Sequence, residues 1–165
     1  MKPIYIPQRD QSDCGVACLA SIIQMHGGFA SIESLRELSG TSIQGTSLLG
    51  LQQAAQKNGL EAEAFEVDDL AVFQAEATFP CILHIVTENN FEHYVVCTAS
   101  PRQKSSDDKS STTYQIIDPA KGIEEWDEAK LLEVWRSRAV LCLTPTTQFE
   151  LKTAQQKKQW RWIFS

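Results

Sequence analysis

The stretch Gln8-Arg-Asp-Gln-Ser-Asp-Cys-Gly-Val-Ala-Cys18 decides the fold, because a polar turn becomes an apolar helix within it. Ser12 and Asp13 are residue types that cap helix N-termini. One buried helical stripe follows at spacing i, i+3, i+4, i+7, formed by Val16, Leu19, Ala20 and Ile23. Gly27-Gly28 then ends the apolar run. We therefore expect a helix over about residues 13–26.

This helix would hold Cys14 in its first turn. Unpaired N–H groups and the helix dipole favour negative charge there, and the nucleophilic form of cysteine is the thiolate. Gly15 would let another group approach the backbone closely. A free cysteine is more often a small buried residue than a nucleophile. Cys14, however, lies at a helix start with Gln8 six residues upstream. This position favours Cys14 as a nucleophile and the Gln8 side chain as a hydrogen-bond donor to an oxyanion.

The composition is that of a globular protein with one domain. The chain has 165 residues, of which 42% are hydrophobic and 22% are charged. A net charge of −6 argues against a nucleic-acid partner. No run of 18 apolar residues is present, so no complete transmembrane helix is expected. The five cysteines follow no zinc-ribbon spacing, and a reducing compartment fits them best.

The remaining pattern predicts helices first and strands later. Further helices are expected over about 32–39, 46–58, 68–74 and 128–135. Strands are expected over about 60–67, 80–87, 92–97, 114–117 and 139–144. The polar residues 100–113 contain no core-forming residue and indicate an exposed loop.

Three histidines compete for the role of general base. His26 would cap the first helix, and His84 lies within an apolar strand, where a hydrogen-bonded core histidine is usual. His93 begins a strand beside a loop, which is where a scaffold presents a catalytic side chain. Given Cys14, we therefore expect His93 to be the base. Asp118 ends the next strand and could accept the imidazole Nδ1–H, although an Asp-Pro turn former is the common alternative.

Four stretches carry a family resemblance. Gln8-x-Asp-x-x-Asp-Cys-Gly-x-Ala-Cys-Leu19 resembles the active-site signature of the C39 peptidases, the cysteine-protease domains at the N-terminus of bacterial ABC exporters for bacteriocins and related peptides. The segment 45–60, the strand start His93-Tyr-Val-Val and the turn Asp118-Pro-Ala-x-Gly122 resemble further parts of the same family. The resemblance covers roughly residues 1–145. It implies an α+β, papain-like cysteine protease fold, with the N-terminal helices packed on an antiparallel sheet.

The resemblance also implies roles for four residues. Cys14 would be the nucleophile, His93 the general base and acid, and Asp118 the residue that orients His93. Gln8, with the backbone N–H of Cys14, would hold the oxyanion. No metal or organic cofactor is expected for this domain, and ATP would be bound by a separate nucleotide-binding domain of the full exporter.

Substrate, partners and location follow from the same resemblance. The expected substrates are peptide precursors whose amphipathic helical leaders end in Gly-Gly. The expected partners are the transmembrane and ATPase parts of an ABC exporter in the same chain, working as a dimer on the cytoplasmic side of the bacterial membrane. Residues 146–165 carry lysine, arginine and tryptophan and are expected to be a juxtamembrane linker beyond a peptidase domain at 1–145.

Two other functions stay open at this point. A C39-like domain can recruit leader peptides with little catalysis, although Cys14 argues against a purely binding role. A stand-alone cysteine hydrolase or transferase could use the same triad on a different acyl substrate. The basic tail speaks mildly against this second alternative.

Overall fold

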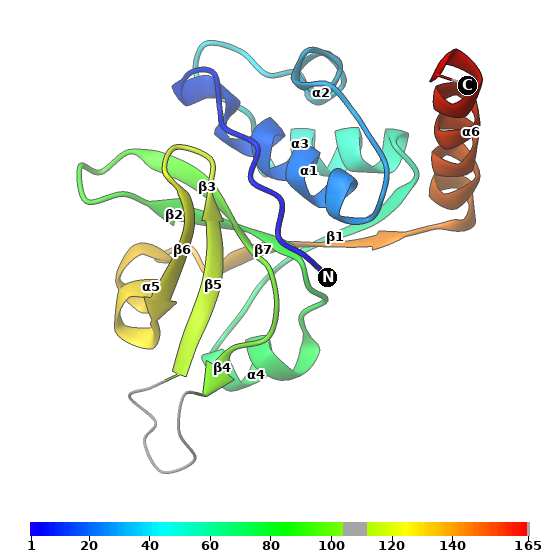
Figure 1. The fold of residues 1–165 in the computed structure, drawn as a ribbon. Helices are drawn as coiled ribbons and strands as arrows, with labels where there is room; N and C mark the ends of the chain where they lie inside the picture. The colour runs from blue at the N-terminus through cyan, green and yellow to red at the C-terminus, as the bar shows by residue number, and fades with distance from the viewer. Residues whose placement is uncertain (104–111, 165) are drawn as a thin grey trace.

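The computed structural model describes residues 1–103 and 112–164 (Figure 1). The helical elements are η1 (Gln11–Asp13), α1 (Cys14–Met25), α2 (Ile32–Ser39), α3 (Leu48–Lys57), α4 (Leu70–Glu76), α5 (Glu128–Val134) and α6 (Thr147–Phe164). The strands are β1 (Leu60–Glu66), β2 (Cys81–Val86), β3 (Glu92–Cys97), β4 (Arg102–Gln103), β5 (Thr112–Asp118), β6 (Gly122–Asp127) and β7 (Ala139–Pro145).

Capping residues explain where the N-terminal helices begin and end. The Ser31 hydroxyl accepts from Ser34 N at 3.1 Å at the start of α2, and Gly40 ends that helix with φ +70°. The Ser47 hydroxyl accepts from Gly50 N at 3.0 Å at the start of α3. These boundaries agree with the sequence prediction, because caps are local signals that a sequence carries by itself.

The described strands form one antiparallel sheet of seven strands. Its order is β1-β7-β2-β3-β5-β4, and β6 pairs with β5 along Thr113–Asp118. β3 lies between β2 and β5, and in its register His93 faces Ile85 of β2. His93, near the start of β3, and Asp118, at the end of β5, therefore lie on neighbouring strands. The expected α+β arrangement is confirmed.

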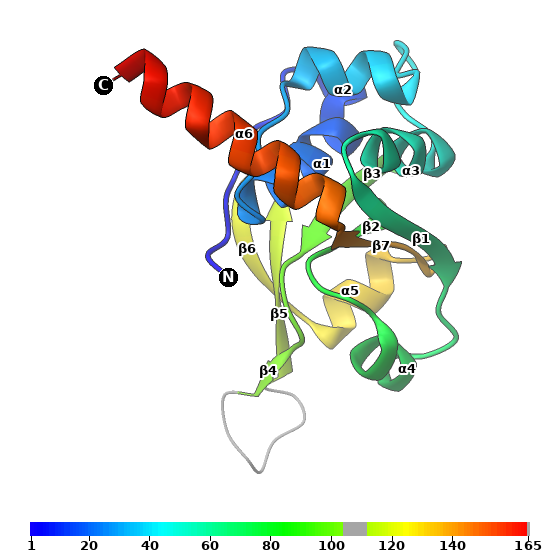
Figure 2. The ribbon, with the colours of Figure 1, turned by 90° about the vertical axis from the view of Figure 1, so that its right-hand side faces the viewer.

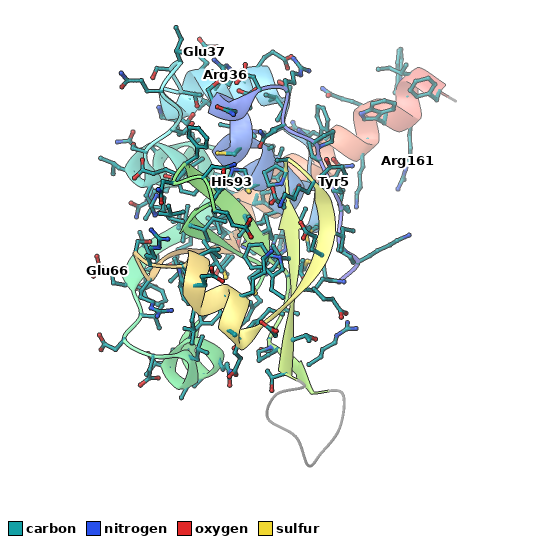
Figure 3. All side chains as sticks on the ribbon, turned by 90° about the vertical axis from the view of Figure 1, so that its left-hand side faces the viewer. Tyr5, Arg36, Glu37, Glu66, His93 and Arg161 are labelled. Carbon is teal, nitrogen blue, oxygen red and sulfur yellow. The ribbon has the colours of Figure 1, made fainter. Side chains whose placement is uncertain are left out.

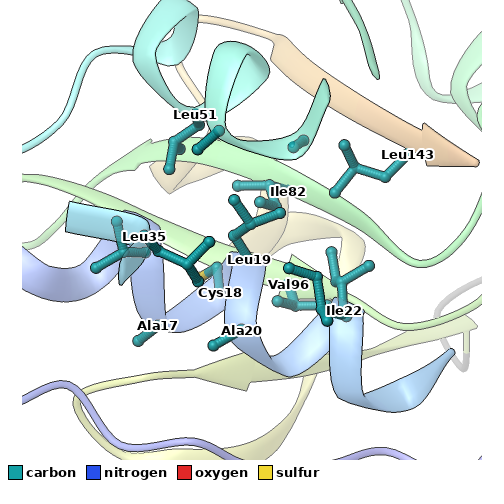
Figure 4. Packing of buried hydrophobic residues seen from close by; sticks show 14 of the residues in the cluster. Ala17, Cys18, Leu19, Ala20, Ile22, Leu35, Leu51, Ile82, Val96 and Leu143 are labelled. Carbon is teal, nitrogen blue, oxygen red and sulfur yellow. The ribbon is translucent and has the colours of Figure 1, made fainter. Parts of the chain in front are cut away.

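Each face of the sheet buries its own apolar core. Tyr94 and Val96 of β3 pack with α1, α2 and α3, while the alternate residues Val95 and Cys97 pack with α4 and α5. Figure 1 shows α1–α3 together on one side of the sheet. In Figure 4 the buried side of α1, with Leu19 and Ile22, meets Leu51 of α3 and Val96 of β3. This packing holds α1, which begins at Cys14, against the sheet.

β4, β6 and α6 were not expected from the sequence. β6 was missed because Glu124 and Glu125 are poor strand formers, and it forms only through its pairing with β5. The tail, to which no element was assigned, is the helix α6, which buries Phe149 and Thr153 and then extends away from the domain (Figure 2). Most of the expected loop at 100–113 lies outside the described residues. Its described ends are partly strand, since Arg102 and Gln103 of β4 pair with Thr113 and Thr112 of β5.

Gly59 offers a test of the junction between α3, β1 and α6. Its φ is +86°, and an added Cβ would lie 2.8 Å from Phe149 N and 2.9 Å from Phe149 Cα. Backbone strain and a clash with main chain should together make Gly59→Ala cost about 3 kcal/mol of unfolding free energy. Gly40→Ala is the matched control, since a Cβ at φ +70° there meets nothing within 4 Å and should cost only about 1 kcal/mol. Urea denaturation measures both, and equal losses would contradict the predicted clash.

Candidate active site

The N-terminal turn positions Cys14 as the first residue of α1. Asp10 caps this turn, because its Oδ1 accepts from Ser12 N at 2.8 Å. Asp13 occupies the N-cap position of α1 but makes no capping hydrogen bond, contrary to the expected capping role. Its carboxylate is instead paired with Arg36 of α2. Cys14 itself is 6% exposed, so it lies at the edge of the helix-side core.

Gly15 brings three elements together at this point. A Cβ built on Gly15 would lie 3.1 Å from Leu51 of α3 and 3.1 Å from the Tyr94 ring of β3. Tyr94 is held in turn by its hydroxyl, which donates to Thr46 O at 2.9 Å. The groups that approach the Gly15 backbone are therefore side chains of the protein's own α3 and β3. Because β3 also carries His93, this packing holds the start of α1 close to His93.

His93 and Asp118 form a buried hydrogen bond. His93 Nε2 donates to Asp118 Oδ1 at 2.7 Å, and the two residues are 8% and 5% exposed. The same Oδ1 accepts from Ala120 N at 2.9 Å, so Asp118 also forms the expected Asp-Pro turn. Burial raises the pKa of Asp118, but the hydrogen bonds from His93 and Ala120 outweigh burial and lower it below the ordinary value.

The charge state of His93 depends on both neighbours. Burial lowers the pKa of His93, but hydrogen bonds with Asp118 and with Cys14 raise it to about 9. We expected Asp118 to bind Nδ1, and this was wrong: the carboxylate binds Nε2. Since Nε2 is occupied, Nδ1 is the nitrogen left for the Cys14 thiol. His93 therefore interacts with both the thiol and the carboxylate.

Gln8 is held beside this group by the extended lead-in. Its backbone N–H donates to Pro119 O at 2.9 Å, directly after Asp118 in the chain. The Tyr5 hydroxyl donates to the same carbonyl at 3.4 Å. Gln8 Oε1 is buried and has no hydrogen-bond partner among the described residues. The structure therefore brings all four residues singled out in the sequence to one place.

A cleft of about 510 Å³ opens onto this group and is lined by Gln8, His93 and Asp118. The β2–β3 hairpin forms one wall with Glu88 and Phe91, and the loop between α2 and α3 contributes Ile43. Ile43 is 96% exposed at the tip of a tight turn, in which Ser42 and Gly45 exchange backbone hydrogen bonds. The role of these residues as cleft walls was not predicted from the sequence. An isoleucine at the tip of a polar turn was the available signal.

The other candidate histidines and cysteines have other contacts or are buried in the core. His84 Nδ1 contacts the Ser137 hydroxyl at 3.0 Å, and His26 packs edge-on against Phe149 with a pKa lowered by burial. Cys18 is 1% exposed, and burial raises its pKa well above the ordinary value. Cys18 and Cys142 are core residues, as expected.

Residues 1–103 and 112–164 contain neither a metal-binding cluster nor a membrane-spanning helix. Within that part of the chain, no group of three or more His, Cys, Asp or Glu residues is arranged to hold a metal ion. No helix described there, α6 included, has the length and apolar character needed to cross a bilayer.

Comparison with known families decides what this site belongs to. The peptidase C39 family model matches residues 2–148. The chain belongs to the peptidase C39 family. The predicted membership is therefore confirmed, and with it a cysteine peptidase of papain-like fold.

Curated relatives of this C39 domain are much longer proteins. The lactococcin-G-processing and transport ATP-binding protein LagD of Lactococcus lactis subsp. lactis is 41% identical over 122 residues, which is 74% of this chain and 16% of LagD. The transport/processing ATP-binding protein ComA of Streptococcus pneumoniae is 32% identical over 146 residues, 88% of this chain and 19% of ComA. The chain thus spans less than a fifth of these relatives.

Solved structures of similar domains share its fold. The peptidase domain of Streptococcus ComA, described as a bi-functional ABC transporter involved in quorum sensing, superposes with a TM-score of 0.73 at 31% identity, covering 86% of this chain and 97% of that one. A double glycine motif protease from an AMS/PCAT transporter, solved in complex with the leader peptide, also gives 0.73, at 29% identity, covering 88% and 93%.

Proposed function

We propose that this C39 domain is a cysteine endopeptidase that cuts leader peptides from secreted precursors after a Gly-Gly site. Cys14 Sγ attacks the carbonyl carbon of the second glycine, while the imidazole of His93 holds the thiol proton. The amide N–H of Gln8 and the backbone N–H of Cys14 donate to the resulting oxyanion. His93 then protonates the leaving amine, and the acyl-enzyme thioester is hydrolysed by water that His93 deprotonates.

One observation carries this proposal: the hydrogen-bonded series Cys14–His93–Asp118 beside an open cleft. A His93 pKa of about 9 means that the imidazole holds a proton at neutral pH. That proton is available for the amine that leaves when the peptide bond breaks. Asp118 orients the ring and stabilises its charge.

The substrate class is supported by the relatives. Processing appears in the names of LagD and ComA, and the AMS/PCAT protease was solved with a leader peptide. Glycine at the two positions before the cut suits a nucleophile that is only 6% exposed, because a larger side chain would be hindered there. The exposed side chains of Ile43 and Phe91 on the cleft walls are positioned to contact apolar residues of a leader.

The proposed setting is an ABC exporter. ATP would be bound by a separate domain, and the peptidase would act on the cytoplasmic side of the membrane as part of a dimer. The helix α6 supports a juxtamembrane position for residues 146–165, since its last turns expose Trp160, Trp162 and Phe164 near Lys157 and Arg161.

Mass spectrometry of a Gly-Gly leader peptide incubated with the protein tests this function. A cut after the second glycine is the expected result, and a matched peptide with Gly-Gly replaced by Val-Val should stay intact. Binding of the leader without cleavage would indicate a recruiting module instead. Neither binding nor cleavage of several such leaders would overturn the proposed substrate class.

A further inference from the structure

We infer that Arg36 of α2 is a positioning residue for the nucleophile, which acts by neutralising the buried carboxylate of Asp13 and by holding the turn from which Cys14 starts α1. Neither residue has a role in the proposed reaction. The inference rests on Cys14 being the nucleophile of the proposed function.

The carboxylate of Asp13 is buried beside the nucleophile. Asp13 directly precedes Cys14, and its side chain is 3% exposed. It makes no capping hydrogen bond at the helix start. A buried carboxylate needs a partner, and an unpaired one beside Cys14 would disfavour negative charge on the thiol.

Arg36 supplies that partner from a different helix. Arg36 Nη1 donates to Asp13 Oδ1 and also to the Ser12 hydroxyl at 3.1 Å. The Ser12 hydroxyl in turn donates to Asp10, whose carboxylate caps η1. One guanidinium group is therefore bonded to two consecutive residues of the turn that ends at Cys14. Figure 3 shows Arg36 beside the blue turn that leads into α1, with His93 further along on β3.

The other groups around Cys14 cannot replace this charge. Among the described residues, Cys18, His93 and Tyr94 interact electrostatically with Cys14, and Asp13 precedes it in the chain. His93 is the one cation in that set, and its hydrogen bond to Asp118 already matches it with a carboxylate. Removing Arg36 would therefore leave one net negative charge next to the thiol.

Arg36 does not line the catalytic cleft. Among the described residues it borders an adjoining hollow with Asp10, and this hollow shares Gln11, Ser12 and Ile43 with the cleft. Loss of Arg36 should therefore lower kcat and leave KM for a leader peptide nearly unchanged. A residue that contacted substrate would show the opposite pattern.

Site-specific alkylation of Cys14 tests the inference without any peptide substrate. At pH 7 the rate of reaction with iodoacetamide, followed by mass spectrometry of the Cys14 peptide, should fall about tenfold in Arg36→Met. Arg36→Lys keeps the charge and should stay within about threefold of wild type. The double variant Arg36→Met with Asp13→Asn removes both charges and should recover most of the rate.

Arg9→Met is the matched control. The Arg9–Glu33 ion pair joins the same two segments, but its side chains are 64% and 60% exposed and do not contact Asp13. Its loss should leave the alkylation rate unchanged.

An unchanged rate in folded Arg36→Met would overturn the inference, as would a double variant that is as slow as Arg36→Met. If Arg36→Met does not fold, the Cys14 alkylation rates of the double variant and of Arg36→Lys still test the inference. If wild type fails to cut Gly-Gly leaders while this alkylation pattern holds, the substrate class falls and the role of Arg36 stands.

Discussion

Cleavage of a Gly-Gly leader should fall by about 10⁴-fold or more when Cys14 is replaced by alanine, because no other described thiol can attack the same carbonyl. Cys18 lies one turn further along α1, but it is 1% exposed within the core, and its pKa is raised by burial. The variant should still bind the leader, since Cys14 contributes only one small side chain to the site. Its unfolding free energy should change by about 1 kcal/mol or less.

The measurement is single-turnover cleavage followed by mass spectrometry, together with a thermal unfolding curve. Cys18→Ala serves as the matched control, because it removes a thiol from the same helix without touching His93. That control should retain cleavage and lose about 1 kcal/mol of stability through a small cavity. Persistent turnover by Cys14→Ala would remove Cys14 from the nucleophile role.

Asp118→Asn should lower kcat about 100-fold, which corresponds to about 2.7 kcal/mol of transition-state stabilisation. Asparagine can still accept hydrogen bonds from His93 Nε2 and Ala120 N, so the turn is kept. What it loses is the negative charge that stabilises the imidazolium. The pKa of His93 should therefore drop from about 9 towards its ordinary value, and a smaller fraction of the protein holds the protonated imidazole at neutral pH.

The pH dependence of stability follows from the same two groups. The folded-state pKa of His93 is raised, so its contribution is fully present below 6.5 and is lost as the pH rises through about 9. The folded-state pKa of Asp118 is lowered, so its contribution is present above 3.8 and is lost as the pH falls through the folded value. The stability difference between wild type and Asp118→Asn should be largest between these limits.

NMR titration of His93 and urea denaturation at pH 7 and pH 10 check this expectation. The stability difference should shrink at pH 10, where His93 is neutral in both proteins. Asp127→Asn is the control, since Asp127 caps α5 through Lys130 N at 2.8 Å and an asparagine caps equally well. An unchanged cleavage rate in Asp118→Asn would reduce Asp118 to a turn former.

Much of the secondary structure could be predicted because its signals are local. Ser31 with Gly40 marked α2, and the run of β-branched and aromatic residues marked β3 with its predicted limits. β6 could not be predicted, because its acidic residues join the sheet only where β5 offers free backbone groups. Local propensity is a weak guide to an edge strand that depends on its neighbour.

The sequence by itself determined the candidate residues and the family, since helix caps, apolar spacing and four short motifs can be recognised without coordinates. Only the tertiary structure decided how those residues meet. The side-chain nitrogen of His93 that binds Asp118 depends on the relative position of β3, β5 and α1. The pairing of Arg36 with Asp13 joins positions 23 residues apart. Such contacts between distant segments follow from how the whole chain packs, and no local stretch of sequence encodes them.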